Sequence, residues 1–252
     1  HILYFMAKAS LAARDERAAR ESLEEMLRLD KKSPRALFAL ETLARLELKS
    51  GRPRRSANWL RILVRRFPDH ERAAEFLARR AEALDRAGLR REAAGEWRRI
   101  WLRYPESAEA ERALDQSRAL EGGLKPPLRS IGPRDHYLRA RRLQKKYHYK
   151  KALSAYLELG RQFPGSPLLR EAEPHKAITL YSLRRTAQAH RALRDALRLA
   201  PRGSPARAKI RFYLSRNYLR RHDQFAFGSE ARRLLKEAPR GGWAARARYL
   251  LA

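Results

Sequence analysis

The chain has 252 residues, of which 58 are Lys or Arg and 28 are Asp or Glu, and its formal net charge is +30. It has no cysteine, which excludes disulfides and thiolate metal sites, and no stretch approaches the about 20 consecutive apolar residues of a membrane-spanning helix. Such a charge favours an anionic partner, or reflects arginine at solvent-facing helix positions without a specific role.

Proline follows an aromatic or apolar residue at a nearly constant interval. The pairs are Phe67-Pro68, Tyr104-Pro105, Phe163-Pro164, Ala200-Pro201 and Ala238-Pro239, with Leu29-Asp30 in the equivalent place near the start. The gaps between successive marks are 38, 37, 59, 37 and 38 residues. This constant period predicts stacked helical hairpins, because one hairpin cannot bury its apolar face without a neighbour. We expect each proline to follow the second helix of a hairpin, since proline cannot continue a helix.

The residues before each proline also repeat in kind. The position 24 residues earlier is small in all five repeats: Ala44, Ala81, Ala140, Ala177 and Ser215. Gly51 and Gly88 stand 17 residues before their prolines, where a tight turn needs a residue tolerant of positive φ. This order of small residue, turn glycine and proline resembles the tetratricopeptide repeat, whose usual length is about 34 residues. We predict an all-α, tetratricopeptide-like α-solenoid, a superhelix of antiparallel helix hairpins with a period of 37–38 residues.

The gap of 59 residues divides the predicted array. It contains clustered Gly and Pro between residues 121 and 133, which indicates a linker or loop because such residues do not occupy helix interiors. We expect a first helical-repeat stack over 1–120 and a second over 134–252, and the linker is either a hinge or a loop without a mechanical role. Residues 1–120 hold 27 basic and 19 acidic side chains, and the remainder holds 31 and 9. The second stack is therefore strongly basic and is expected to face an anionic partner.

Four segments carry a narrower resemblance. They read KALSAYLEL (151–159), FPGSP (163–167), AITLYSLRR (177–185) and GWAARARYLLA (242–252). In these segments the sequence resembles the helical N-terminal region of soluble lytic murein transglycosylases, and the resemblance is strongest over residues 134–252. The resemblance implies a curved superhelix or ring, a periplasmic location, contact with peptidoglycan, and a separate C-terminal domain that cleaves glycan strands.

That catalytic domain is marked by a Glu-Ser pair followed by a Gly-Leu-Met-Gln segment. Here Glu-Ser occurs only at Glu21-Ser22 and Glu106-Ser107, inside the repeat pattern, and neither methionine lies in such a segment. We therefore expect no catalytic residues and no catalytic domain in this chain. Because the sequence begins with His1, we expect it to be an excised or processed piece of a longer protein, and this chain itself contains no signal sequence.

First-helix positions are expected to line the inner face of the superhelix. In the second stack these candidate ligand contacts are Arg134, Tyr137, Arg141, Gln144, Lys209, Phe212 and Arg216. Alternatively, the register drifts and some of them pack against neighbouring helices. A dense basic stretch from Arg139 to Lys151, interleaved with Tyr147 and Tyr149, could contact phosphates or sugars, or be a solvated helix face with aromatic residues at the turn.

The histidines show no spacing typical of metal ligands, so we expect neither a metal nor a cofactor. Three functions remain. The first is a non-catalytic solenoid that binds or guides peptidoglycan, or supports a catalytic domain absent from this chain. The second is a protein–protein interaction scaffold in bacterial envelope assembly, and the third, weaker one is a basic nucleic-acid binder.

Overall fold

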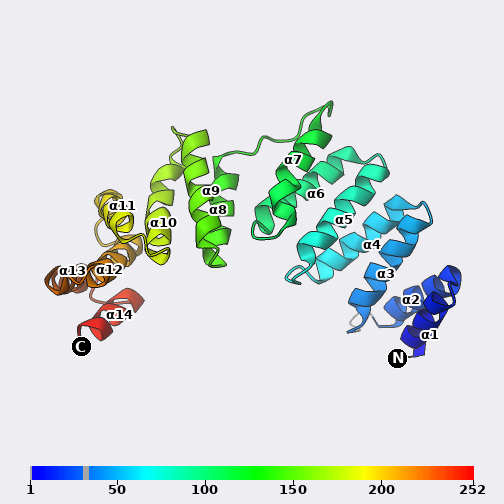
Figure 1. The fold of residues 1–252 in the computed structure, drawn as a ribbon, viewed down its shortest axis with the longest axis horizontal. Coiled ribbons are helices and arrows are strands. Elements are labelled where there is room, and N and C mark those ends of the chain that lie inside the picture. The colour runs from blue at the N-terminus through cyan, green and yellow to red at the C-terminus, as the bar shows by residue number, and fades with distance from the viewer. Residues whose placement is uncertain (1, 31–33) are drawn as a thin grey trace. The chain divides into compact units, whose positions relative to one another are not determined.

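The computed structural model describes residues 2–30 and 34–252. These residues form helices, turns and loops, with no strand among them, and fourteen helices are defined in this part of the chain. The chain divides into two compact units, His1–Arg129 and Ser130–Ala252. Figure 1 shows the helices of each unit stacked in chain order. No helix in the described ranges has the length and apolar character needed to cross a bilayer.

The first unit consists of three antiparallel hairpins followed by one more helix. Its helices are α1 (Ile2–Ala12), α2 (Glu16–Leu29), α3 (Ala36–Lys49), α4 (Pro53–Arg66), α5 (Ala73–Arg86), α6 (Arg90–Arg103) and α7 (Glu109–Glu121). Each helix packs against its neighbours along the chain, and α7 packs on both α6 and α5. Helix α7 thus covers the last hairpin of this unit.

The second unit repeats this arrangement. Its helices are α8 (Pro133–Lys145), α9 (Tyr149–Gln162), α10 (Leu168–Ser182), α11 (Thr186–Leu199), α12 (Pro205–Arg220), α13 (Gln224–Glu237) and α14 (Gly242–Leu251). The first helices of successive hairpins also touch, because α10 packs against α8 and α12, and α12 packs against α14. The boundary between the units follows Arg129, inside the Gly/Pro-rich segment.

The proline marks fall where the periodicity predicts. Helices α4, α6, α9, α11 and α13 each end two residues before a marked proline, and α2 ends at Leu29. The residue between helix and proline donates its backbone N–H to a carbonyl of the last turn, as Phe67 does to Leu63 at 2.9 Å. Proline itself has no N–H to continue the ladder, so the chain leaves the helix there.

The turn inside each hairpin uses a left-handed residue. Gly51 and Gly88 have φ of +70° and +75°, which confirms the expectation for these glycines. The equivalent positions in the second unit are Tyr147, Arg184 and His222, with φ of +63°, +59° and +61°. In all five turns the next residue donates its N–H to the carbonyl five residues earlier, the bond that closes a helix C-terminus after a left-handed residue.

The core follows the repeat. The small residues Ala44, Ala81, Ala140, Ala177 and Ser215 are all buried, which allows the two helices of a hairpin to approach closely. The residues five positions before each proline are fully buried as well: Leu63, Ile100, Leu159, Ala196 and Leu234. These packed hairpins confirm the predicted all-α, tetratricopeptide-like α-solenoid class.

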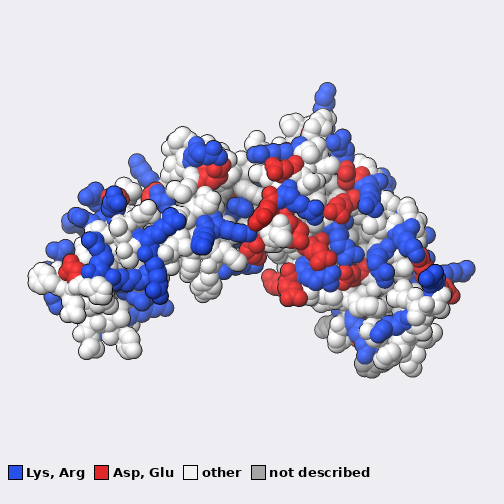
Figure 2. All heavy atoms as spheres, in the orientation of Figure 1, with Lys and Arg blue, Asp and Glu red and all other residues white. Residues whose placement is uncertain are grey.

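Several ion pairs of the first unit join neighbouring hairpins. Glu41 on α3 accepts from Arg72 and from Arg79, each at 2.7 Å. The buried carboxylate of Glu47 is paired with Arg20 at 2.9 Å and with Arg52 at 2.5 Å. Since acids and bases are interspersed here, the first unit has a mixed surface, and Figure 2 shows red beside blue over this unit and mainly blue over α10–α14.

Candidate binding groove of the second unit

Three hollows lie along the first helices of the second unit. The first, of about 390 Å³, lies between α8, α10, α12 and the end of α11. The second, of about 320 Å³, shares His175, Ile178 and Lys209 with it. The third, of about 500 Å³, lies between α12 and α14 and shares Tyr213 with the second. Because neighbouring hollows share walls, they form one surface, here called the first-helix groove.

Six of the seven predicted contact residues line this groove. Tyr137 lines the first hollow, Arg141 and Gln144 line the second, and Lys209 lines both. Phe212 and Arg216 line the third hollow. Arg134 is exposed at the start of α8 and lines none of the three.

Two of these residues are engaged inside the unit. Phe212 is only 5% exposed and packs in a core cluster with Leu234 and Ala244, so it presents little surface to a ligand. Gln144 donates from Nε2 to the carbonyl of His175 at 2.8 Å and to Thr179 Oγ1 at 2.9 Å. Phe212 thus packs against neighbouring helices, as the alternative interpretation predicts for some first-helix residues. Gln144 joins α8 to α10 through its hydrogen bonds.

The basic and aromatic stretch from Arg139 to Lys151 spans the end of α8, the turn and the start of α9. Four of its basic or aromatic residues line the second hollow: Arg141, Lys145, Tyr147 and Tyr149. The Tyr147 and Tyr149 rings meet edge to face with centroids 6.1 Å apart. The turn therefore supplies aromatic surface to the groove, next to two cations.

Helix α10 supplies groove residues that the sequence reasoning missed. Pro174 and Ile178 stand at the same distance from their proline mark as Tyr137 and Arg141 do from theirs, and both line the first hollow. The same spacing could have found them. Neither side chain is charged or aromatic, so charge and aromatic character give no signal for them.

His175 lies at the centre of the groove. Arg141 Nη1 contacts its imidazole ring. Burial lowers the pKa of His175 to about 3, with further contributions from the charges of Arg141, Lys209 and Lys145. The ring is therefore neutral at neutral pH and can accept a hydrogen bond from the guanidinium. A neutral histidine adds no charge, so the potential here is set by the surrounding cations.

The cations of the groove are crowded. Burial, and then the charge of Arg141, lower the pKa of Lys209. Among the described residues that line the three hollows, Glu171 is the single carboxylate, against six basic side chains: Arg141, Lys145, Arg170, Lys209, Arg216 and Arg246. An anion bound here would relieve the repulsion between these cations, which favours a negatively charged ligand.

Aromatic rings support several of these cations. The Arg246 guanidinium lies 4.7 Å and Lys209 Nζ lies 5.8 Å from the centre of the Trp243 ring. Arg216 lies 5.8 Å from the centre of the Tyr181 ring. Contacts of this type stabilise a cation without neutralising it. The charges are thus placed by packing and still free to attract an anion.

The described residues contain no group of three or more histidine or acidic side chains that could hold a metal ion. What the groove combines is positive charge, aromatic faces and apolar hollows. These features suit the binding of an extended anionic chain that carries apolar side groups.

Comparison with known proteins gives one family match. Residues 10–80, which span part of α1 through part of α5, match the tetratricopeptide repeat family. No curated protein matches the sequence. The family match gives no support to the narrower resemblance to soluble lytic murein transglycosylases.

Three solved structures with a similar chain course are distant from this chain in sequence. The TPR domain of P58(IPK) is 14% identical with a TM-score of 0.41, and the match covers 99% of this chain and 64% of that one. The apo form of the quorum sensor NprR from B. thuringiensis is 16% identical with a TM-score of 0.42, covering 99% and 68%. A tetratricopeptide repeat protein from Parabacteroides merdae is 14% identical with a TM-score of 0.39, covering 99% and 96%.

Proposed function

We propose that this protein is a non-catalytic scaffold of the tetratricopeptide type whose second unit binds an extended acidic segment of a partner protein in the first-helix groove. One observation carries the proposal. Six basic side chains and one carboxylate, Glu171, line a series of connected hollows. Helical-repeat arrays present long surfaces of this kind to their partners.

The apolar walls favour a peptide over a nucleic acid. Ile178, Leu199 and Pro201 line the first hollow, and Leu250 lines the third. Such hollows accept the aliphatic or aromatic side chains of a peptide whose carboxylates pair with the surrounding cations. A phosphate backbone would use the charges and leave these apolar walls without a partner, so the nucleic-acid function is the weaker alternative.

A second candidate function concerns the cell wall. The segment 177–185, one of those that resemble soluble lytic murein transglycosylases, belongs to α10 and the turn after it, and its Ile178 lines the groove. In this form of the proposal the protein acts in the bacterial periplasm. There it guides peptidoglycan, whose peptides carry carboxylates, supports a catalytic domain outside this chain, or assembles envelope proteins. The positive charge of the second unit supports this cell-wall function as much as it supports the binding of an acidic peptide.

A binding experiment separates these functions. Fluorescence anisotropy would follow a labelled peptide of alternating Glu and Leu, with a Gln-for-Glu peptide of the same length as reference, using the full chain. We expect the acidic peptide to bind more tightly, and its affinity to fall as salt is raised. Lys209→Ala and Arg216→Ala should each weaken it, whereas Arg232→Ala, an exposed arginine of α13 outside the groove, should not.

Two outcomes would overturn the peptide proposal. One is equal binding of the acidic and the Gln peptide, and the other is undiminished binding by both groove variants. Sedimentation with insoluble murein sacculi at low salt tests the cell-wall candidate, because retention that is lost in Lys209→Ala supports it and absence of retention contradicts it. A nucleic-acid oligomer that binds better than the peptide would favour the third function.

A further inference from the structure

Another hollow of the second unit, of about 580 Å³, lies between α11, α12 and α13. Its walls carry six arginines: Arg194, Arg198, Arg202, Arg207, Arg211 and Arg233. We call it the arginine pocket. It shares Ala200 with the first hollow of the groove, but none of its cations lines the first-helix groove, so its arginines form a separate charge cluster.

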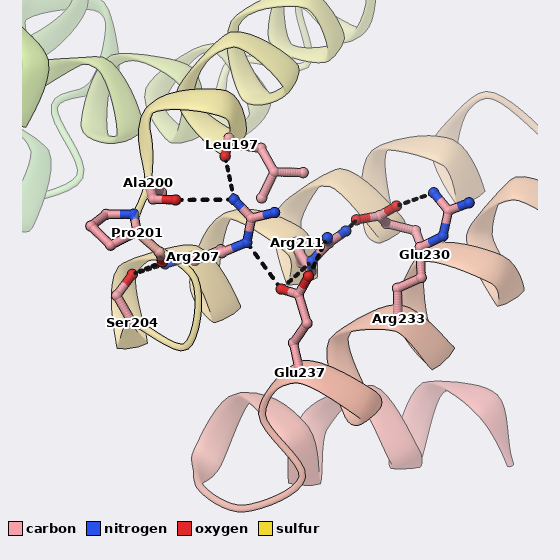
Figure 3. A network of polar contacts seen from close by, with 9 residues as sticks. All are labelled: Leu197, Ala200, Pro201, Ser204, Arg207, Arg211, Glu230, Arg233 and Glu237. Carbon is pink, nitrogen blue, oxygen red and sulfur yellow. Dashed lines mark hydrogen bonds and ion pairs between the residues drawn. The ribbon is translucent and has the colours of Figure 1, made fainter.

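Two arginines form a fixed floor. Arg207 donates from Nη1 to the carbonyls of Leu197 at 2.6 Å and Ala200 at 3.0 Å. Both carbonyls lie at the C-terminal end of α11. Its Nε donates to Glu237 Oε2 at 3.0 Å. Arg211 binds the same carboxylate through Nε at 2.8 Å and Nη2 at 2.7 Å. Figure 3 shows Arg207 and Arg211 of α12 converging on Glu237 of α13.

The rim carries cations that are less completely neutralised. Arg198 pairs with Asp195 at 3.2 Å, and Arg233 lies 3.7 Å from Glu230, which is already occupied by Arg211. Within the described part of the chain, Arg194 and Arg202 have no hydrogen-bond or ion-pair partner. Three carboxylates, Asp195, Glu230 and Glu237, pair with four of the six arginines. The six arginines therefore carry three positive charges in excess of their acidic partners.

We propose that the arginine pocket binds a small anion that carries two or more phosphate groups. Guanidinium groups bind phosphate oxygens through paired N–H donors, and they are weakly hydrated compared with ammonium groups. The floor arginines are already ordered, so less side-chain entropy is lost on binding. The volume falls within the range of small-molecule pockets, and the excess of three charges exceeds what a single phosphate would neutralise.

The chemistry of the walls separates this pocket from the peptide groove. Apart from arginine and Glu230, its walls contribute Leu197, Ala200, Leu214 and Tyr218. Leu214 is buried in a core cluster, so most of the accessible lining is guanidinium. Such walls offer many hydrogen-bond donors and little apolar surface, which suits a compact polyphosphate better than a peptide that carries apolar side chains.

Isothermal titration of the full chain with inorganic triphosphate tests the proposal, with orthophosphate and sulfate as references at constant ionic strength. We expect triphosphate to bind at least ten-fold more tightly than either reference. The double variant Arg194→Ala/Arg202→Ala should weaken triphosphate binding at least ten-fold, because it removes two unpaired guanidinium groups. The matched control Arg191→Ala/Arg240→Ala removes two exposed arginines that do not line the pocket and should bind as the wild type does.

Circular dichroism verifies that both double variants are folded. The proposal is overturned if sulfate binds as tightly as triphosphate, or if the Arg194/Arg202 variant binds as the wild type does. It is overturned too if Lys209→Ala alone abolishes triphosphate binding, since that would place the anion in the first-helix groove. Peptide binding by the Arg194/Arg202 variant should be unchanged, so failure of one proposal leaves the other intact.

Discussion

Arg211 on α12 and Glu230 on α13 form a buried ion pair, with side chains only 9% and 7% exposed. Both residues line the arginine pocket, and the pair joins the two helices of one hairpin. Removing one partner from a buried pair leaves an uncompensated charge, whereas an exposed pair contributes little.

Glu230→Gln should therefore destabilise the protein by about 2 kcal/mol, because the guanidinium of Arg211 loses a buried carboxylate and keeps Glu237 as its one remaining acidic partner. The control is Glu158→Gln, which breaks the exposed pair with Arg161 on α9 and should cost less than about 1 kcal/mol. Urea denaturation followed by circular dichroism measures both. Equal effects of the two substitutions would show that the Arg211–Glu230 pair is not buried in solution.

Two glycines of the same hairpin should respond in opposite directions to alanine. Gly88 has φ of +75°, whereas Gly95 lies in the middle of α6 on its exposed side. A Cβ at either position would meet no atom within 4 Å. Gly88→Ala should destabilise by about 1 kcal/mol, since only backbone strain is added. Gly95→Ala should stabilise by up to about 1 kcal/mol, because alanine has the higher helix propensity. Thermal denaturation of both variants checks the signs, and a stabilising Gly88→Ala would contradict the left-handed turn.

The small residue Ala177 permits the close approach of α10 to its neighbours, and it is completely buried. Ala177→Trp should destabilise by about 3 kcal/mol or prevent folding of the second unit, because the indole has no space in a packed core. Ala187→Trp, at an exposed position of α11, is the matched control and should change stability little. Denaturant titration measures the difference. A tolerated Ala177→Trp would contradict the tight hairpin packing.

The carboxylate of Glu237 has a low pKa, of about 2, because it accepts hydrogen bonds from Arg211 and Arg207. Since this pKa lies below the ordinary value of 4.5, the carboxylate stabilises the fold above about pH 4.5 and loses this contribution as pH falls toward 2. Glu237→Gln should be less stable than wild type at pH 7, and the difference should shrink to zero near pH 2. Unfolding midpoints across this range test the trend, with Asp195→Asn as the exposed control. A difference that stays constant with pH would contradict it.

His175 gives a second pH dependence. Its pKa of about 3 lies below the ordinary 6.5, so between these values the unfolded chain binds a proton that the folded chain excludes. Lowering the pH from 7.5 to 5 should therefore cost the wild type roughly 2 kcal/mol more than it costs His175→Gln. His148→Gln, in an exposed turn, is the control. Equal pH slopes for wild type and His175→Gln would show that His175 is solvated in solution.

Much of this fold could be predicted from the periodicity. Helix ends, buried small residues and the first-helix face of Tyr137 and Arg141 follow from local rules, because helical spacing and proline act over a few residues. The turns were predicted only in part. Glycine indicates the left-handed position at Gly51 and Gly88, whereas Arg184 adopts it without glycine since helix packing on both sides outweighs the local cost.

The repeat pattern thus predicts the helical hairpin, its period and the residues on one side of each first helix. Tertiary packing sets which side chains meet: Arg141 beside His175, Gln144 bonded to α10, Phe212 in the core, and the arginines of α11, α12 and α13 around one pocket. The reason is that periodicity repeats within a hairpin, whereas contacts between hairpins depend on how each one rotates and packs against the next.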